Sequence, residues 1–286
     1  MSRSAAPQAN SAVRGTEAAQ MRNPAPPAVT LYARENPEFG ERVAHATALL
    51  QSVSSEFPGR VVLASSLGAE DMVLIDMISR QRLPIPVATL DTGRLHAQTL
   101  ALIERSERRY ALSIERHAPR AEAVITFVDR EGADAMYRSV ELRKACCALR
   151  KLEPLQRLLA GREAWITGLR RDQSGTRLDV PFREHDADGR VKLNPLADWR
   201  WSDVWHYIAV HQVPYNPLHD AHMPSIGCEP CTRAISLGED FRAGRWWWED
   251  QSAKECGLHF NDRSPRTDVE PSATADDHLH HLAPAA

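Results

Sequence analysis

The most constraining feature of this 286-residue chain is an alternation of short apolar runs with stretches of helical periodicity. The apolar runs predict strands, and the stretches between them predict helices. The predicted strands cover residues 60–64, 86–90, 112–116 and 164–167, and the predicted helices cover residues 70–80 and 96–109. Repeated strand and helix units imply an α/β fold with a parallel sheet flanked by helices on both faces. Ligands of such folds bind beyond the carboxyl ends of the strands.

Five cysteines divide into a group of four and a fifth that stands alone. The group consists of an adjacent pair and a C-x-x-C, and the fifth lies near the end of the chain. The five are Cys146, Cys147, Cys228, Cys231 and Cys256. Thiolates are soft ligands that suit iron-sulfur clusters and zinc, and a fifth thiol has no place in either kind of site. The pattern therefore predicts a four-thiolate metal or cluster site with a separate nucleophile.

Two other uses of these cysteines compete with a cluster. Zinc sites in single domains usually present two spaced pairs, whereas adjacent cysteines point about 100° apart on a helix. Structural disulfides are disfavoured by the odd cysteine count and by the lack of an apolar signal segment near the first residue. Both features are expected of a reduced, cytoplasmic protein. The spacing thus favours a cluster and leaves zinc as the alternative.

Composition limits the kinds of partner. Hydrophobic residues make up 43% of the chain and charged residues 26%, which is typical of a globular protein. No apolar run approaches about 18 residues, so no membrane span is expected. A net charge of −3 argues against a general nucleic-acid-binding protein. A small-molecule ligand is expected instead.

The domain boundaries are predicted from where the periodicity stops. Residues 1–35 are rich in Ala, Pro, Ser and Asn, and residues 263–286 carry Pro, Asp and a short His-rich tract, so both predict disordered tails. Between them we expect one α/β domain over residues 36–250. A mobile segment over residues 251–262 would then carry Cys256. The histidine tract is interpreted as solvated tail rather than as a metal site.

Candidate anion contacts gather near these motifs. The loop over residues 65–71 follows a predicted strand, and its small residues let backbone N–H groups approach an anion at the start of a helix. It is not a Walker A sequence, because no Gly-Lys-Ser/Thr follows. Arginine suits phosphate and sulfate recognition, and basic residues flank the thiol motifs. These cations are Arg143, Lys144, Arg150, Lys151, Arg170, Arg171, Arg177, Arg242 and Arg245.

Seven motifs, in order along the chain, resemble those of a known family. They are Ser65-x-x-Gly68-Ala69-Glu70-Asp71, Leu90-Asp91-Thr92-Gly93-Arg94, Lys144-Ala145-Cys146-Cys147, Thr167-Gly168-x-Arg170-Arg171-x-x-Ser174, Gly227-Cys228-Glu229-Pro230-Cys231-Thr232-Arg233, Arg245-Trp246-Trp247-Trp248-Glu249 and Lys254-Glu255-Cys256-Gly257-Leu258-His259. Together they resemble the assimilatory adenylyl-sulfate (APS) reductases of the phosphoadenylyl-sulfate (PAPS) reductase family. The resemblance covers about residues 60–260.

The resemblance implies a fold and a reaction. The fold is an adenine-nucleotide alpha-hydrolase-like parallel sheet related to the PP-loop pyrophosphatases. The reaction, part of sulfate assimilation and cysteine biosynthesis, releases sulfite and AMP from APS with reduced thioredoxin. The cysteine count itself also calls for an outside thiol, because no sixth cysteine is present to resolve an S-sulfocysteine within the chain.

The resemblance also implies roles for individual residues. Cys256 would be the nucleophile, and the other four cysteines would ligate a [4Fe-4S] cluster. The residues implied to bind the substrate are Ser65, Asp71, Leu90, Thr92, Lys151, Arg177, Arg242 and Arg245. Lys151 follows Cys147 by four residues, a helical offset that would keep it near the cluster.

Several points stay open at the level of sequence. The family loop usually carries a second serine where this chain has Leu67, which removes one hydroxyl donor. Members with the Cys-Cys and C-x-x-C motifs mostly use APS, so APS is expected over PAPS, with PAPS reduction or dual specificity as the alternative. A nucleotide-binding iron-sulfur or zinc protein without turnover would share every motif except that of Cys256. Nothing decides whether the chain forms a homo-oligomer.

Overall fold

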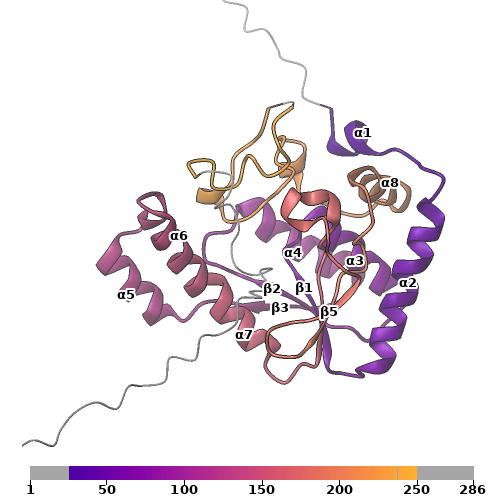
Figure 1. Cartoon of the computed structure of the whole chain (residues 1–286), viewed down its shortest axis with the longest axis horizontal. Coiled ribbons are helices and arrows are strands. Elements are labelled where there is room, and N and C mark those ends of the chain that lie inside the picture. The colour runs from indigo at the N-terminus through magenta and orange to yellow at the C-terminus, as the bar shows by residue number, and fades with distance from the viewer. Residues whose placement is uncertain (1–25, 237, 250–286) are drawn as a thin grey trace, which may run out of the picture.

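The fold is built on a six-stranded sheet, as Figure 1 shows for a computed structural model that describes residues 26–236 and 238–249. The strands are β1 (Val61–Ser65), β2 (Val87–Leu90), β3 (Ile114–His117), β4 (Ala164–Ile166), β5 (Arg183–His185) and β6 (Val191–Leu193). Their order across the sheet is β3-β2-β1-β4-β6-β5. All neighbouring strands are parallel except β5, which pairs antiparallel with β6 at one edge.

Helices cover both faces of this sheet. The α-helices are α1 (Ala28–Tyr32), α2 (Phe39–Glu56), α3 (Ala69–Arg80), α4 (Ala97–Tyr110), α5 (Ala121–Glu131), α6 (Val140–Cys147), α7 (Glu153–Leu159) and α8 (Trp201–His211). A π-helical turn, η2 (Ala148–Leu152), joins α6 to α7. Short 3-10 helices are η1 (Ala135–Tyr137), η3 (Arg171–Gln173), η4 (Gly175–Arg177), η5 (Pro217–His219) and η6 (Glu229–Cys231). Figure 1 shows α5, α6 and α7 on one side of the sheet and α2, α3 and α8 on the other.

Two clusters of the hydrophobic core lie on opposite faces of the sheet, because side chains of a strand point alternately to opposite faces. Val61 and Leu63 of β1 pack in the larger cluster, which includes α2, α3 and α8. Val62 lies in the smaller cluster, which includes Leu158 and Leu159 around α7. Every one of these side chains is at most 3% exposed. Burial on both faces explains why the central strands are continuously apolar in sequence.

The predicted elements are confirmed to within about two residues, and the predicted α/β fold class is correct. Sequence reasoning missed β5 and β6. These strands have three residues each and carry charged side chains, so they do not read as buried runs. Lys192 of β6 is nevertheless only 3% exposed, and its Nζ lies 3.0 Å from Glu184 Oε1 of β5. Because this edge of the sheet contains a cross-strand ion pair, its strands lack the apolar pattern that would predict them from sequence.

The predicted boundary of the N-terminal tail, at about residue 35, is wrong. Helix α1 lies inside the predicted tail, and Ala28 is fully buried. The backbone N–H of Ala28 donates to Asp220 Oδ1 at 2.7 Å, and the Tyr32 ring lies 5.8 Å from that of Trp201 on α8. Apolar side chains in an Ala- and Pro-rich stretch therefore order it against α8. The mobile segment over 251–262 and the C-terminal tail were predicted for residues outside the described part of the chain.

Helices long and apolar enough to cross a membrane are absent from residues 26–236 and 238–249.

Candidate active site

A large cavity opens at the carboxyl ends of β1, β2 and β4. The chain runs from β1 outward to β2 and β3, and then returns to build β4 and β6 on the other side of β1. This reversal of strand order creates the crevice in which doubly wound sheets bind ligands. The cavity encloses about 1360 Å³ between the atoms, its open mouth included. It is large enough for a nucleotide-sized molecule.

The β1–α3 loop forms one wall of the cavity. Ser65 Oγ accepts a hydrogen bond from the N–H of Leu67 at 3.0 Å, and both residues are buried. Ser66 donates to Asp71 Oδ2 twice, from its backbone N–H at 2.6 Å and from its hydroxyl at 2.7 Å. Burial raises the pKa of Asp71 to about 6, although the bonds from Ser66 act in the opposite direction. The loop thus holds a weakly acidic carboxylate at the start of α3.

Leu67 occupies a position in the hydrophobic core, which suits an apolar side chain rather than a hydroxyl. Its side chain is 1% exposed in the larger core cluster, and its φ is 60°. The residue points into the core and does not line the cavity. Leu67, which stands where the family usually has a second serine, is therefore a core residue rather than part of the cavity wall.

The β4–η3 segment closes against the same loop. A Cβ on Gly168 would lie 2.4 Å from Asp71 Oδ1 and 2.9 Å from Glu70 Cβ, so only glycine fits there. Arg170, which is fully buried, donates from Nε to Glu70 Oε1 at 2.9 Å, and Gln173 Nε2 donates to the same oxygen at 2.9 Å. These contacts fix the start of α3 against β4.

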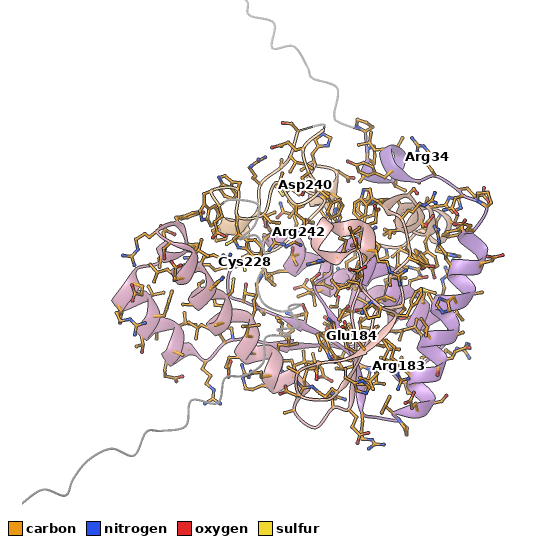
Figure 2. The ribbon with its side chains drawn as sticks, viewed as in Figure 1. Arg34, Arg183, Glu184, Cys228, Asp240 and Arg242 are labelled. Atoms are coloured by element: carbon orange, nitrogen blue, oxygen red, sulfur yellow. The ribbon has the colours of Figure 1, made fainter. Side chains whose placement is uncertain are left out.

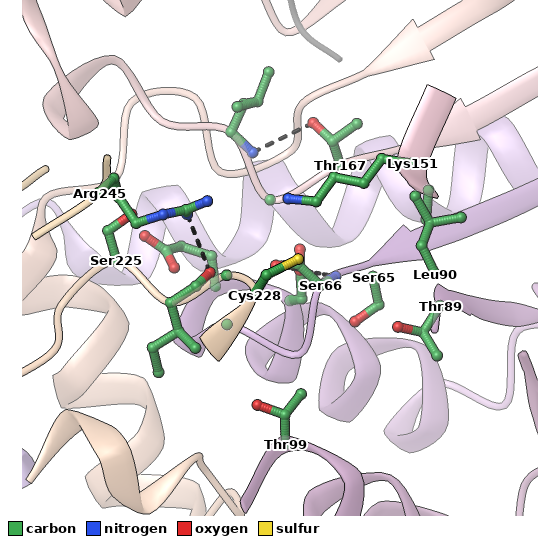
Figure 3. Close-up of a pocket in the computed structure, with 18 of the residues that line it drawn as sticks. Ser65, Ser66, Thr89, Leu90, Thr99, Lys151, Thr167, Ser225, Cys228 and Arg245 are labelled. Atoms are coloured by element: carbon green, nitrogen blue, oxygen red, sulfur yellow. Dashed lines mark hydrogen bonds between the residues drawn. The ribbon is translucent and has the colours of Figure 1, made fainter. Parts of the chain in front are cut away.

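Four cationic side chains also line the cavity: Lys151, Arg177, Arg242 and Arg245. Figure 3 shows Lys151 and Arg245 pointing into the same space as the sulfur of Cys228. Arg245 is held by donation from Nη1 to the Ile226 carbonyl at 3.3 Å. Its guanidinium also lies 4.7 Å from the ring centroid of Trp246. A cluster of positive charge beside a polar loop, with Arg177 and Arg245 buried, is suited to an anionic nucleotide.

The β2–α4 loop connects this cavity to the cysteines. Leu90 ends β2, and both Leu90 and Thr92 line the cavity. Thr92 Oγ1 lies 3.2 Å from Cys228 Sγ, and the Thr92 carbonyl accepts from Arg150 Nη1 at 2.8 Å. Thr92 therefore lines the larger cavity and contacts the C-x-x-C segment at the same time.

The four cysteines of the described chain line a second, smaller cavity. Cys146 and Cys147 end α6, while Cys228 directly precedes η6 and Cys231 ends it, so two segments far apart in sequence meet there. None of the four forms a disulfide. Figure 2 shows Cys228 and Arg242 close together, away from Arg183 and Glu184 on β5. Lys151, Cys228 and Trp246 line both cavities and therefore form the wall between the two.

The acidity of these thiols differs from one to the next. Burial raises the pKa of Cys146, and burial with the neighbouring Cys228 thiol raises the pKa of Cys231 to about 12. Burial also disfavours the Cys228 thiolate, but the charge of Lys151 and the hydrogen bond with Thr92 outweigh it and lower the Cys228 pKa. A thiolate anion is thus favoured at the wall that faces the larger cavity.

Comparison with known proteins identifies the family. The model of the phosphoadenosine phosphosulfate reductase domain matches residues 60–234. The chain belongs to this family. A relative from Allochromatium vinosum named adenosine 5'-phosphosulfate reductase is 57% identical and covers 81% of this chain and 90% of its own length. Proteins with the same name from Burkholderia cepacia and Neisseria meningitidis serogroup A are 52% and 54% identical, over 80% and 68% of this chain and 92% and 81% of their own.

A solved structure supports the same assignment. The phosphoadenylyl-sulfate (PAPS) reductase of Candida auris, in a phosphate complex, has a TM-score of 0.57 and 25% identity with this chain. The match covers 71% of this chain and 98% of that protein. That PAPS reductase therefore shares the overall fold described above.

The structure brings the predicted substrate residues of the reductase family to one cavity. Its walls include Ser65, Asp71, Leu90, Thr92, Lys151, Arg177, Arg242 and Arg245. Their contact with a substrate stays a prediction. Cys256, the predicted nucleophile, lies outside the described residues.

Sequence reasoning did not assign roles to Glu70, Gly168 and Gln173, which build the cavity wall. The signal was present in the motif Thr167-Gly168-x-Arg170-Arg171, because a glycine directly after a strand marks close approach of two segments. Gly227 is a similar case. A Cβ there would lie 2.3 Å from Arg245 Nη2, so a larger residue before Cys228 would require the Arg245 guanidinium to move.

Proposed function

We propose that this chain reduces APS to sulfite and AMP in sulfate assimilation and cysteine biosynthesis. One observation carries the proposal: Lys151, Cys228 and Trp246 form the wall between a nucleotide-sized cavity and a cavity lined by four cysteines. In this proposal the nucleotide part of APS binds beside Ser65 and Asp71, and the phosphosulfate binds beside Arg242 and Arg245. High identity to proteins named adenosine 5'-phosphosulfate reductase supports this substrate class.

The four cysteines fit a [4Fe-4S] cluster. They are a pure thiolate set, free of disulfides, around one cavity, and no group of three or more His, Cys, Asp or Glu side chains among residues 26–236 and 238–249 is placed to hold a single ion. A zinc ion needs four ligands within about 2.3 Å of one point, whereas a cluster accepts a wider spacing. Bound there, a cluster would supply an electric field and fix both cysteine segments. The raised pKa values of Cys146 and Cys231 indicate that added positive charge is needed to keep them as thiolates.

The chemical step uses the fifth cysteine. The Cys256 thiolate attacks the sulfur of APS and forms a sulfur-sulfur bond, while the bond from that sulfur to the bridging phosphate oxygen breaks. The oxygen keeps the electron pair, and AMP leaves. Lys151, Arg242 and Arg245 stabilise the charge that develops on the leaving phosphate, because all three cations line the cavity. The product on the enzyme is an S-sulfocysteine.

Thioredoxin completes the cycle. One of its thiolates attacks Cys256 Sγ, and sulfite leaves with the electron pair of the sulfur-sulfur bond. The second thioredoxin thiol then displaces Cys256 from the mixed disulfide and loses its proton to solvent. Thioredoxin is oxidised to its disulfide, and the two electrons reside on sulfite. Because intact thiols are required throughout, we place the chain in the reducing environment of the cytoplasm.

The test is made on protein purified without oxygen. We expect iron in stoichiometry with the chain, sulfite release from APS with reduced thioredoxin, and a sulfonate on Cys256 alone when thioredoxin is omitted. Cys256→Ser should lose all turnover while it keeps iron and APS binding, because a serine hydroxyl is hardly ionised at neutral pH. Cys228→Ser, the matched control at a ligand, should lose the iron. Stoichiometric zinc without iron, or full activity of Cys256→Ser, would sink the proposal.

APS is proposed as the preferred substrate over PAPS. The relatives above 50% identity carry the APS name, whereas the PAPS reductase of Candida auris is 25% identical. We expect kcat/KM for APS to exceed that for PAPS by a wide margin. Equal or greater efficiency with PAPS would overturn the preference and leave the reaction type intact.

A further inference from the structure

Two exposed aromatic rings lie together beside the cysteine cavity. Tyr137 is 42% exposed and Trp247 is 40% exposed, and their ring centroids are 6.3 Å apart. They come from η1 and from the end of the described chain, which are 110 residues apart in sequence (247 minus 137). Large aromatic side chains are usually buried to a greater extent, so two partly exposed rings side by side indicate a recognition surface.

This aromatic pair is held in a fixed position. The Tyr137 hydroxyl donates to the carbonyl of Pro230, inside the C-x-x-C, at 2.6 Å. The ring of Trp248 packs edge-on against Tyr137 at 4.5 Å and against Trp247 at 4.8 Å. Fixed rings lose little conformational entropy when a partner binds, and aromatic side chains of this kind dominate the binding energy of interfaces.

Charged residues surround the aromatic pair. Arg138, next to Tyr137, forms an ion pair with Glu131 at 3.0 Å, and Arg94 Nη1 lies 3.8 Å from Asp134 Oδ1. A small apolar centre with a polar rim is typical of complexes that form and dissociate, whereas permanent subunit interfaces are larger and more apolar. The surface therefore suits a partner that leaves after each encounter.

The position of the pair relative to the nucleophile identifies the partner. Glu249 is the last described residue and is anchored by a buried ion pair to Arg143, with Nη2 2.7 Å from Oε2. Cys256 follows seven residues later, so the chain allows it at most about 25 Å from that anchor. A thiol that reacts with Cys256 must come within this range. Trp247 is two residues before the anchor.

We propose that Tyr137 and Trp247 form the docking surface for the protein dithiol that reduces S-sulfonated Cys256. This inference rests on the proposed function. The dithiol donates two electrons: its first thiolate bonds to Cys256 Sγ as sulfite leaves, and its second thiol releases Cys256 and forms the disulfide. Docking on the aromatic pair raises the local concentration of that first thiolate near the sulfocysteine.

The test separates the two half-reactions in the full-length protein. In Trp247→Ala, the rate at which APS sulfonates Cys256 without reductant should equal wild type. Release of sulfite by the small dithiol dithiothreitol should also be unchanged. With reduced thioredoxin, kcat/KM for thioredoxin should fall about tenfold or more, as expected when a central interface tryptophan is truncated. Trp247→Phe, which keeps a ring, should recover most of the loss.

Val210→Ala is the matched control, because Val210 is 56% exposed on α8 and lies outside the aromatic pair. It should leave all three rates unchanged. Unchanged kcat/KM for thioredoxin in Trp247→Ala would overturn the docking inference, and so would a slower sulfonation step, which would show that the pair serves the chain's own segment. A shift in sedimentation from dimer to monomer would assign the surface to a second copy instead. If APS does not sulfonate Cys256 in the wild-type protein, both the proposed function and the docking inference are wrong.

Discussion

Arg143 and Glu249 form a bidentate ion pair that joins the helix of the adjacent cysteines to the end of the described chain. Arg143 Nε lies 3.0 Å from Oε1 and Nη2 lies 2.7 Å from Oε2, and the two side chains are 0% and 3% exposed. The guanidinium also lies 4.6 Å from the ring centroid of Trp246. The pair therefore fixes the point from which the segment with Cys256 departs.

Glu249→Leu should destabilise the protein strongly. The substitution removes the carboxylate from a buried guanidinium, and loss of one partner of a buried pair costs about 3–5 kcal/mol. Urea unfolding under anaerobic conditions should show a lower midpoint with an unchanged slope. Glu56→Gln is the control, because the ion pair of Glu56 with Arg183 has both side chains 41% exposed, and its midpoint should stay at wild type. Equal midpoints for both variants would contradict the anchoring role.

Gly168→Ala should weaken nucleotide binding and stability together. The added Cβ would meet Asp71 Oδ1 at 2.4 Å, so the start of α3 has to shift. Overpacking of this kind costs about 1–3 kcal/mol. We expect a lower unfolding midpoint and a larger Kd for AMP by calorimetry.

A second glycine provides the comparison. Gly40 lies in α2, and a Cβ there meets nothing within 4 Å, so Gly40→Ala should be neutral or slightly stabilising. AMP binding by Gly40→Ala should match wild type. The close contact between β4 and α3 would be disproved by Gly168→Ala protein that binds AMP with wild-type affinity.

Asp71 should make the stability of the free protein fall as the pH rises from about 4 to 7. Burial raises its pKa in the folded state from the ordinary 3.8 to about 6, so in this interval the folded state binds more protons than the unfolded state. The contribution of Asp71 to the free energy of unfolding is therefore fully present below pH 3.8 and is lost as the pH rises through 6. Asp71→Asn removes this dependence. The free energy of unfolding of Asp71→Asn, relative to that of wild type, should rise by up to about 3 kcal/mol across the interval, measured by urea unfolding at each pH. Parallel curves for the two proteins would show that Asp71 titrates normally.

The sequence predicted the parts of the fold that depend on local pattern. The strands at 60–64 and 86–90 were visible because the central strands of a parallel sheet are buried on both faces and are continuously apolar. The cysteine count separated four residues that now line one cavity from Cys256, since soft thiolates have few other uses in a reduced protein.

Contacts between distant residues could not be predicted in this way. Nothing in the sequence pairs Arg143 with Glu249, because any of the arginines flanking the thiol motifs could take that carboxylate. The helical offset that placed Lys151 near the cysteines assumed an α-helix, but residues 148–152 form a π-helical turn. Lys151 still reaches both cavities. Such π-helical turns are frequent at functional sites, but amino-acid helix propensities do not predict where they occur.

Lys151→Gln should impair the reaction with APS without changing the iron content of the cysteine cavity. The lysine charge faces the larger cavity and lowers the pKa of Cys228, yet Lys151 contributes no thiolate. Loss of one charged contact to the phosphosulfate costs about 1.5–3 kcal/mol, so kcat/KM for APS should fall at least about tenfold. Iron content should remain at wild type. Lys144→Gln is the matched control, because Lys144 is exposed and two residues before Cys146. Wild-type kcat/KM in Lys151→Gln would show that the lysine serves the cysteines alone, and loss of iron would show that it holds the cluster cavity together. Only a fall in kcat/KM with full iron content assigns its charge to the substrate.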